Sequence, residues 1–272
     1  MLPRGARIIN IDSNGDISKL LGETPTPSSL DDLSTEKYQS DDIKRIDSLL
    51  RINAMRWGTV YGFANEQMGR TVQNIFPVKS DSSEQISSSS SVELELHTET
   101  AFHAEKPDTV FLYCLRDDQH AGTTVSQLDD FIGDIDRETR NILKKASFIT
   151  TIDKSFAKAN NASLELKTSI LSDDEKSISY DKALMRGATE EAQAALNVLL
   201  AAVERHKKTI VLKAGEALVM HNHSTIHGRT SFTARYDGTD RWLKRIMIKL
   251  GGPSREVSFF GDESFWVVKT LY

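Results

Sequence analysis

The stretch from Val92 to His103, VELELHTETAFH, alternates along its length with a period of two residues. Such alternation predicts a β-strand, because successive side chains of a strand point to opposite faces of the sheet. One face would carry Glu93, Glu95, His97 and Glu99, and the other Val92, Leu94, Leu96 and Thr98. Two interpretations of the polar face stay open at this point, since it can be solvated or can hold a ligand.

Further strands and two helices follow from similar patterns. Apolar or alternating runs predict strands over residues 106–118, 209–232 and 241–250, and the Asp-Gly pair in ARYDGTD (residues 234–240) predicts a hairpin joining the last two. Apolar residues at helical spacing predict a helix that Ser40 or Asp41 caps and Gly58 ends, and a second helix over 189–208 that Thr189 caps. We expect one domain over residues 1–272, mostly β with flanking helices (α+β).

Composition excludes several classes of protein. A chain of 272 residues can bury a sizeable core, and a net charge of -5 provides no basic field for binding nucleic acid. No run of 18 apolar residues suggests a membrane span, and the first residues lack the pattern of a signal peptide. The single cysteine, Cys114, lies in an apolar run, which predicts a buried thiol in a reducing compartment. We therefore expect a cytoplasmic protein.

A serine-rich segment, SDSSEQISSSSS, covers Ser80 to Ser91 directly before the alternating stretch. Segments of this composition are most often flexible surface connectors. Because this one leads into the strand with the polar face, it can instead fold over whatever that face holds.

His97 and Glu99 are two residues apart on the predicted strand, so their Cβ atoms lie roughly 7 Å apart on one face and both can reach one metal ion. A third ligand must come from elsewhere, and His221, His223 and His227 are the candidates in HNHSTIHGR. Two histidines and one carboxylate form the triad of non-haem Fe(II) oxygenases. An H-x-E pair alone is a weak signal, and a zinc site built from the histidines is the alternative.

Two arginines narrow this choice. In the predicted strand RWLKRIMIKL, Arg241 and Arg245 share a face and lie roughly 13 Å apart. The fixed fork of a guanidinium suits a carboxylate. Two inward-facing arginines therefore predict two anionic groups in the site.

Four stretches carry a family resemblance: LELHTETAFH (94–103), PDTVFLYCLRDD (107–118), GTTVSQL (122–128) and HGRTSFTARYDGTDRWLKR (227–245). They resemble the clavaminate synthase-like Fe(II)/2-oxoglutarate-dependent oxygenases, which include asparagine and arginine hydroxylases, over roughly residues 62–250. The resemblance implies a double-stranded β-helix, or jelly roll. It also implies His97, Glu99 and His227 as iron ligands, because His227 directly precedes Gly-Arg and lies fourteen residues before Arg241. His221 and His223 are then bystanders.

The same resemblance implies roles for other residues. Arg241 would bind the distal carboxylate of 2-oxoglutarate with help from Thr124, or from Thr123 beside it, and Arg245 would bind the carboxylate of the substrate. Gln67, Ser87 or Ser88, and Asp181 would contact the rest of the substrate, with Asp181 in a lid or insert at about residues 157–186. Ordinary surface polarity is the alternative for these four residues. The N-terminal portion looks shorter than is usual in the family.

The implied activity is hydroxylation of an unactivated carbon of a free L-amino acid with a polar or basic side chain, using Fe(II), 2-oxoglutarate and O2. Such an enzyme would fit specialised metabolism, such as antibiotic biosynthesis. Desaturation or cyclisation is an alternative outcome, and an amino acid on a carrier protein or a dipeptide is an alternative substrate. A jelly roll that binds a metal or small acid without catalysis, or a zinc hydrolase, represents a different class.

Overall fold

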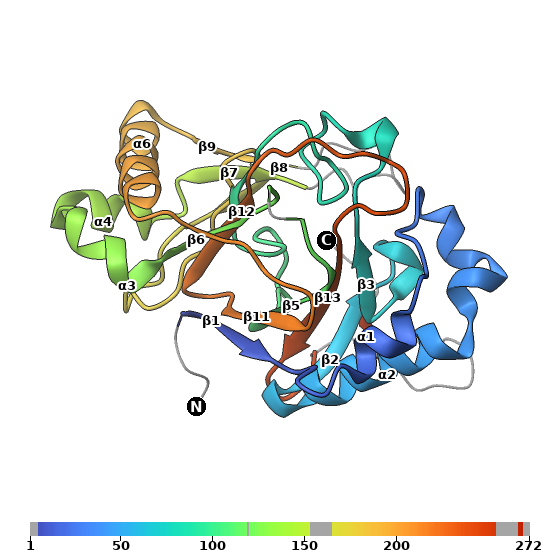
Figure 1. Ribbon diagram of the computed structural model, residues 1–272. Coiled ribbons are helices and arrows are strands. Elements are labelled where there is room, and N and C mark those ends of the chain that lie inside the picture. The colour runs from blue at the N-terminus through green and yellow to red at the C-terminus, as the bar shows by residue number, and fades with distance from the viewer. Residues whose placement is uncertain (1–4, 119, 153–164, 254–265, 269–272) are drawn as a thin grey trace.

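A computed structural model describes residues 5–118, 120–152, 165–253 and 266–268 (Figure 1). The strands of the described chain form three sheets, and its longest helices lie toward the two ends of the molecule (Figure 1). This mostly β architecture with helices is the one predicted from the sequence.

The largest sheet has seven strands in the order β1-β11-β5-β13-β2-β14, and β3 also pairs with β13. Every pairing is antiparallel except that of β2 with β14. Strand β5, the apolar run predicted to be buried, lies in the middle of this sheet. The strands are β1 (Ala6–Asn10), β2 (Thr59–Phe63), β3 (Val72–Ile75), β5 (Thr109–Arg116), β11 (Glu216–His221), β13 (Trp242–Lys249) and β14 (Trp266–Val268).

A second sheet has four strands in the order β10-β6-β12-β4. Its strands are β4 (Leu94–His97), β6 (Thr123–Gln127), β10 (Lys208–Ile210) and β12 (Thr225–Arg229). Leu112 and Leu218 of the larger sheet belong to the same buried apolar cluster as Val125 of the smaller one. The two sheets therefore pack against each other through apolar side chains, which accounts for a large part of their mutual stability.

Helix α2 (Asp41–Ala54) covers the outer face of the larger sheet. Ser40 caps it, since its hydroxyl oxygen accepts from the amide of Ile43 at 3.4 Å, and apolar residues such as Leu50 pack against the sheet. The helix ends three residues earlier than the stop signal at Gly58 suggests, because a 3-10 turn separates them. Short elements complete this layer: α1 (Asp16–Leu21), η1 (Asp31–Ser34), η2 (Glu36–Gln39) and η3 (Met55–Trp57).

Helix α6 (Glu190–Arg205) packs against the outer face of the smaller sheet, where the hydroxyl of Ser126 donates to the carbonyl of Val203 at 3.0 Å. Thr189 caps it by accepting from the amide of Ala192, as its sequence predicts. A third sheet, β8-β7-β9, lies beside this helix. The elements here are α3 (Leu128–Phe131), η6 (Ile132–Asp134), α4 (Arg137–Leu143), β7 (Phe148–Thr151), β8 (Glu165–Thr168) and β9 (Met185–Gly187).

The hairpin predicted at Asp237 and Gly238 is wrong as a strand pairing. Gly238 does form a turn, with φ at 86°, but the strand before it, β12, belongs to the four-stranded sheet and the strand after it, β13, to the seven-stranded sheet. An Asp-Gly pair specifies a local reversal of the chain and not which strands pair across it. The turn therefore carries the chain from one sheet to the other.

The serine-rich segment is folded. The amides of Ser90 and Ser91 both donate to the carbonyl of Ser82, at 3.2 and 2.9 Å, and Ser89 and Ser90 are buried. Two 3-10 turns, η4 (Gln67–Gly69) and η5 (Lys79–Asp81), precede it. Of the two interpretations offered by the sequence, the structure supports the one in which this segment folds over the polar strand.

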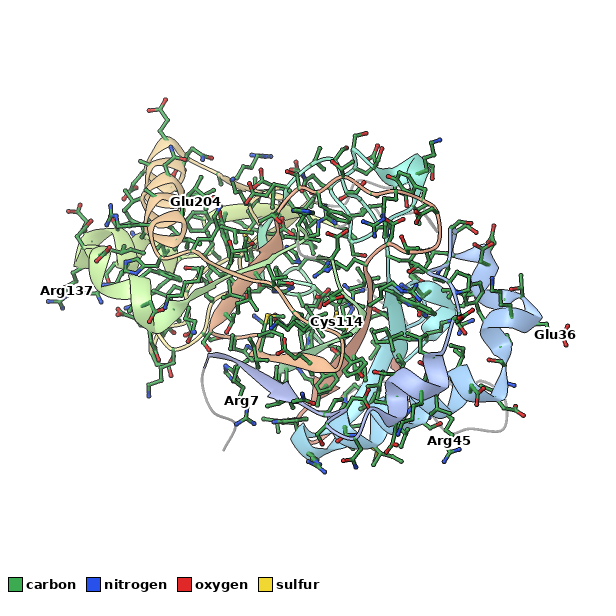
Figure 2. The ribbon with its side chains drawn as sticks, viewed as in Figure 1. Arg7, Glu36, Arg45, Cys114, Arg137 and Glu204 are labelled. Atoms are coloured by element: carbon green, nitrogen blue, oxygen red, sulfur yellow. The ribbon has the colours of Figure 1, made fainter. Side chains whose placement is uncertain are left out.

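Cys114 is a free, buried cysteine in the centre of the molecule, whereas Glu36, Arg45 and Arg137 lie at its edges (Figure 2). Burial raises the pKa of its thiol to about 12, so the side chain behaves as a small apolar group. In the described part of the chain, no helix combines the length and the apolar character that a membrane crossing demands.

Candidate active site

One pocket of about 540 Å³ opens between the two larger sheets. Side chains from β4, β6, β12 and β13 line it together with the serine-rich segment and the turn at η4. The pocket contains His97, Glu99 and His227 at one side and three arginines, Arg229, Arg241 and Arg245, at the other parts of its wall.

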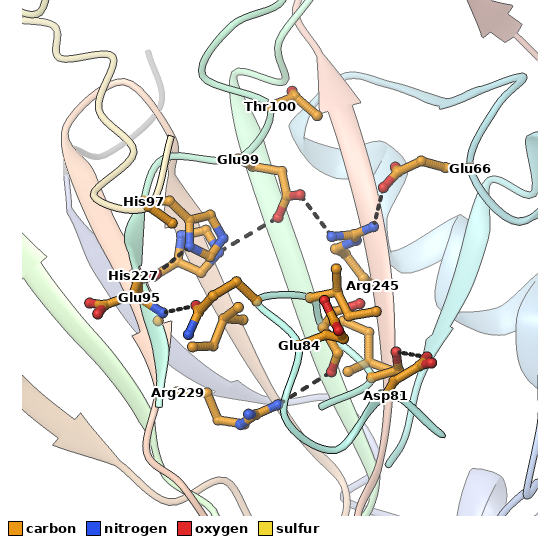
Figure 3. Close-up of a pocket in the computed structure, with 18 of the residues that line it drawn as sticks. Glu66, Asp81, Glu84, Glu95, His97, Glu99, Thr100, His227, Arg229 and Arg245 are labelled. Carbon is orange, nitrogen blue, oxygen red and sulfur yellow. Dashed lines mark hydrogen bonds and ion pairs between the residues drawn. The ribbon is translucent and has the colours of Figure 1, made fainter. Parts of the chain in front are cut away.

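The three predicted metal ligands converge in this pocket. His97 ends β4 and lies directly across from His227 on the neighbouring strand β12, with the imidazole centroids 4.4 Å apart. Glu99 follows two residues after His97 and places Oε2 at 3.6 Å from Nε2 of His227. One potential ligand atom from each residue lies within 4.8 Å of the other two (Figure 3). The spacing suits a single metal ion.

Neighbouring groups hold two of these ligands in place. Nδ1 of His97 donates to the carbonyl of Glu95 at 2.7 Å, which directs Nε2 toward the pocket. The side-chain oxygen of Asn222 accepts from the amide of Glu99 at 2.7 Å, and its nitrogen donates to the Glu99 carbonyl at 3.1 Å. Asn222 has no signal of its own in the sequence, because its partner is 123 residues away.

The protonation states fit a divalent cation. Burial raises the pKa of Glu99, but the nearby Arg245 and His227 outweigh it and hold that pKa at about 2. Burial lowers the pKa of His227, and the neighbouring imidazole of His97 adds to this. Metal ligation requires an ionised carboxylate and neutral imidazoles. Nδ1 of His227 is buried and has no hydrogen-bond partner in the described residues, whereas Nε2 faces Glu99.

Arg245 is bound directly to one of these ligands. Its Nη1 donates to Oε1 of Glu99 at 2.7 Å and its Nη2 to Oε1 of Glu66 at 3.1 Å (Figure 3). Its Nε donates to the side-chain oxygen of Gln73 at 2.8 Å. Glu99 thus offers one oxygen to Arg245 and the other to the metal position. Neither Glu66 nor Gln73 was expected from the sequence, because strand pairing across β13 and β3 brings Gln73 opposite Arg245.

Arg241 lies at another part of the pocket wall and is 6% exposed. Its Nη2 donates to the hydroxyl of Thr123 at 3.0 Å, and no carboxylate lies within ion-pair distance in the described part of the chain. Burial lowers the pKa of its guanidinium to about 10. A buried cation without a counter-ion is costly unless a ligand supplies the charge.

The structure places Thr123, and not Thr124, beside Arg241. Thr123 lines the pocket, whereas Thr124 is the next residue on β6 and projects to the opposite face, where its hydroxyl has no described partner. Spacing along the sequence favoured Thr124 and could not decide between adjacent residues. The alternation of the strand decides it.

Gln67, Ser87, Ser88 and Asp181 all line the pocket. Gln67 has φ at 43° and pairs its amide with the backbone of Asn74, at 2.7 and 2.9 Å. The hydroxyl of Ser88 donates to Asp81 at 2.6 Å, and one carboxylate oxygen of Asp181 accepts from the amides of residues 183 and 184. All four predicted substrate contacts are therefore at the pocket wall.

His221 and His223 lie outside the cluster. The strand expected to carry all three histidines is interrupted by a turn, so His221 ends β11 while His227 lies on β12. His223 binds Asp108 through Nε2 at 2.7 Å. Across the residues that the structure covers, His97, Glu99 and His227 are the only group that could hold a metal, which removes the zinc site built from the other histidines.

Two histidines and one carboxylate that can share a metal lie between the packed sheets, beside a buried arginine without a counter-ion in the described residues. This arrangement is that of a 2-His-1-carboxylate metal site. Sequence comparison extends this: the CsiD family matches residues 7–249. The chain belongs to the CsiD family.

Two curated relatives illustrate the similarity. L-lysine 3-hydroxylase of Catenulispora acidiphila is 34% identical over 201 residues, which cover 72% of this chain and 56% of that enzyme. Clavaminate synthase 2 of Streptomyces clavuligerus is 28% identical over 216 residues, covering 76% of this chain and 66% of the relative. The resemblance seen in the sequence is thereby confirmed. The chain spans only 56% to 63% of the length of several of the amino-acid hydroxylases that it matches.

Two solved structures are also similar. Asparagine oxygenase in complex with Fe(II), 2S,3S-3-hydroxyasparagine and succinate has a TM-score of 0.79 and 28% identity, and the match covers 99% of this chain and 81% of that one. The non-heme iron oxygenase OrfP in complex with Fe, succinate and (3S)-hydroxy-L-Arg has a TM-score of 0.77 and 27% identity, covering 90% of this chain and 76% of that one.

Proposed function

We propose that this protein is an Fe(II)- and 2-oxoglutarate-dependent oxygenase that hydroxylates an unactivated carbon of a free L-amino acid. The observation that carries the proposal is the convergence of His97, Glu99 and His227 beside a buried arginine, Arg241, that has no described counter-ion. When bound, Fe(II) with 2-oxoglutarate supplies the activation of O2 that such a reaction needs. The relatives and structures named above act on, or contain, amino acids and support the same conclusion.

The protein's own contribution is positioning. Arg241 binds the distal carboxylate of 2-oxoglutarate, and Thr123 orients the guanidinium by accepting a hydrogen bond from it. Arg245 binds the carboxylate of the amino acid. Arg245 already donates to Glu99 and to Glu66, so the substrate carboxylate would share a guanidinium that also positions a metal ligand.

Gln67, Ser87, Ser88 and Asp181 form the wall that contacts the rest of the substrate. Besides Asp181, the wall carries the carboxylates of Asp81 and Glu84, and their charge favours a substrate with a polar or basic side chain. Hydroxylation, and not halogenation, agrees with the presence of the Glu99 carboxylate as a third ligand. Desaturation and cyclisation remain alternative outcomes of the reaction, and a carrier-bound amino acid or a dipeptide remains an alternative substrate.

We further infer that the two packed sheets form a double-stranded β-helix, or jelly roll, within a single domain. Support comes from their antiparallel pairing and the apolar cluster between them. Part of the proposed lid at 157–186 lies outside the described residues, and its described part carries β8, β9 and Asp181. A cytoplasmic location stays a prediction that rests on the single buried cysteine.

Succinate release tests the proposal. The purified protein is supplied with Fe(II), 2-oxoglutarate and each of the standard L-amino acids, and mass spectrometry identifies the product. We expect one or a few polar or basic amino acids to stimulate succinate and to gain one oxygen atom. His227→Ala serves as the matched inactive control. If none of these free amino acids stimulates succinate above this control, the proposed hydroxylation of a free amino acid is wrong.

A further inference from the structure

Arg229 is the third buried arginine of the pocket, and the proposed function leaves it without a role. It ends β12, two residues after His227, and is 4% exposed. Its Nη1 donates to the carbonyl of Ser89 at 2.5 Å, and Nη2 donates to the hydroxyl of Ser89 at 3.0 Å and to the carbonyl of Val92 at 2.9 Å. A longer bond of 3.4 Å reaches the carbonyl of Ser87 (Figure 3).

All of these contacts join Arg229 to residues 87–92, which comprise the second half of the serine-rich segment and Val92 directly after it. The same half is held from the other side by Phe232, whose amide donates to the carbonyl of Ser90 at 2.8 Å, and whose ring lies under the guanidinium at 5.3 Å. Ser87 and Ser88, two of the proposed substrate contacts, lie in this half. Arg229 therefore helps to fix the position of Ser87 and Ser88 in the pocket wall.

Every one of these acceptors is neutral. No carboxylate lies within ion-pair distance of Arg229 in the described residues, although a buried guanidinium normally needs one. Arg241 also lacks a carboxylate partner in the described residues. The two arginines are close neighbours, because Thr123 accepts a hydrogen bond from Arg241 and pairs with Arg229 between strands β6 and β12. Two buried cations without a counter-ion in the described residues thus lie next to Thr123, which lines the pocket.

Two like charges in a medium of low dielectric constant repel each other and weaken the bonds that each makes. A carboxylate bound by Arg241 would remove the repulsion and attract both guanidiniums. The hydrogen bonds that Arg229 donates to the serine-rich segment would then be stronger in the protein that holds the carboxylate than in the protein without it.

We propose that Arg229 is a positioning residue that couples occupancy of the cosubstrate end of the pocket to the order of the substrate wall at residues 87–92. The proposal rests on the proposed function, because it takes 2-oxoglutarate as the anion at Arg241. It predicts that binding of 2-oxoglutarate orders residues 87–92 before the amino acid binds. The coupling requires two properties of Arg229. Its positive charge interacts with the anion, and its planar guanidinium hydrogen-bonds to Ser89 and Val92 at the same time.

Hydrogen–deuterium exchange of the serine-rich segment tests this coupling. The amides of Ser89, Ser90 and Ser91 donate to carbonyls inside the segment, so their exchange reports whether it is closed. Exchange is measured in the full protein with Mn(II) alone and with Mn(II) plus saturating 2-oxoglutarate, and calorimetric titration gives the 2-oxoglutarate affinity of each variant. No turnover is needed.

In the wild type we expect 2-oxoglutarate to slow exchange of these amides several-fold beyond Mn(II) alone. Arg229→Gln should exchange on the order of tenfold faster without 2-oxoglutarate, because several hydrogen bonds are lost. Arg229→Lys keeps the charge and loses the fork, so it should bind 2-oxoglutarate nearly as well as the wild type but show no slowing. In turnover, Arg229→Lys should raise KM for the amino acid and leave KM for 2-oxoglutarate almost unchanged.

Arg45→Gln is the matched control, because Arg45 is exposed on α2 at the edge of the molecule (Figure 2); it should behave as the wild type does. If 2-oxoglutarate binds and slows exchange in Arg229→Lys as much as in the wild type, the coupling is wrong while the proposed function stands. If 2-oxoglutarate does not bind to the wild type, the proposed function fails and the coupling with it. Should Arg229→Gln not fold, Arg229→Lys carries the test.

Discussion

Replacing Arg241 with methionine separates two effects of this buried cation. Its guanidinium is covered by the protein and makes one hydrogen bond, to Thr123. In the ligand-free protein, the change removes a buried charge without a described partner, together with that single bond. We therefore expect the free energy of unfolding of the ligand-free protein to fall by less than about 1 kcal/mol, or to rise.

Binding of 2-oxoglutarate should respond quite differently. Truncating one partner of a buried, hydrogen-bonded charge pair costs about 2–5 kcal/mol. Even the lower figure corresponds to a dissociation constant raised about 30-fold. The variant should thus lose the cosubstrate while keeping its fold, which few substitutions at a buried position do.

Denaturant unfolding with and without 2-oxoglutarate, in the presence of Mn(II), measures both quantities. At a concentration 100 times the wild-type Kd, binding adds about 2.7 kcal/mol to the free energy of unfolding of the wild type, but only about 0.9 kcal/mol after a 30-fold loss of affinity. Arg241→Lys, which keeps the charge, should lie between the two. Equal stabilisation of wild type and Arg241→Met by 2-oxoglutarate would refute the assignment of Arg241 to the cosubstrate.

Three further predictions follow from the contacts. Thr123→Val should raise KM for 2-oxoglutarate several-fold in steady-state assays, whereas Thr124→Val should leave it unchanged and cost little stability, because the Thr124 hydroxyl has no described partner. Arg245→Ala should lower the free energy of unfolding by about 3 kcal/mol in urea, since it leaves Glu99 without its ion-pair partner, and should raise KM for the amino acid. Burial raises the pKa of Asp108, but the hydrogen bond from His223 and other contacts outweigh burial and hold that pKa below its ordinary value of 3.8. A lowered carboxyl pKa stabilises the fold above pH 3.8, and this stabilisation is lost as pH falls through the folded pKa. Asp108→Asn should therefore be less stable than the wild type by about 1–2 kcal/mol at pH 7, with the difference shrinking as pH falls below 3.8; a difference that does not change with pH would contradict the ion-pair explanation.

The features that follow from local chemistry could be predicted before the fold was seen. Ser40 and Thr189 cap their helices as expected, since a cap involves residues three positions apart. The burial of β5 follows from its continuous apolar run. His97 and Glu99 were candidates because a period of two places them on one side of the chain, and the Gly-Arg after His227 singled out the third histidine through a family resemblance.

Contacts between distant segments could not be predicted in this way. The Asp-Gly pair specified a turn, but whether β12 and β13 pair depends on the sheet that each strand joins. Thr123 replaces Thr124 beside Arg241 because the register of β6 sets which hydroxyl faces inward. Composition alone gave no reason to expect that the serine-rich segment closes over the pocket. Its position depends on Arg229, which lies about 140 residues further along the chain.

The sequence by itself therefore determined the chemistry available to this protein: two histidines and a carboxylate that can reach one metal, and arginines suited to anions. The tertiary structure decided which of these groups share a pocket and how each one is paired. Arg245 is already held by Glu99 and Glu66, while Arg241 and Arg229 have no described carboxylate. The physical reason is that residue types set which interactions are possible, whereas burial and the distances between strands set which of them are made and which are left for a ligand.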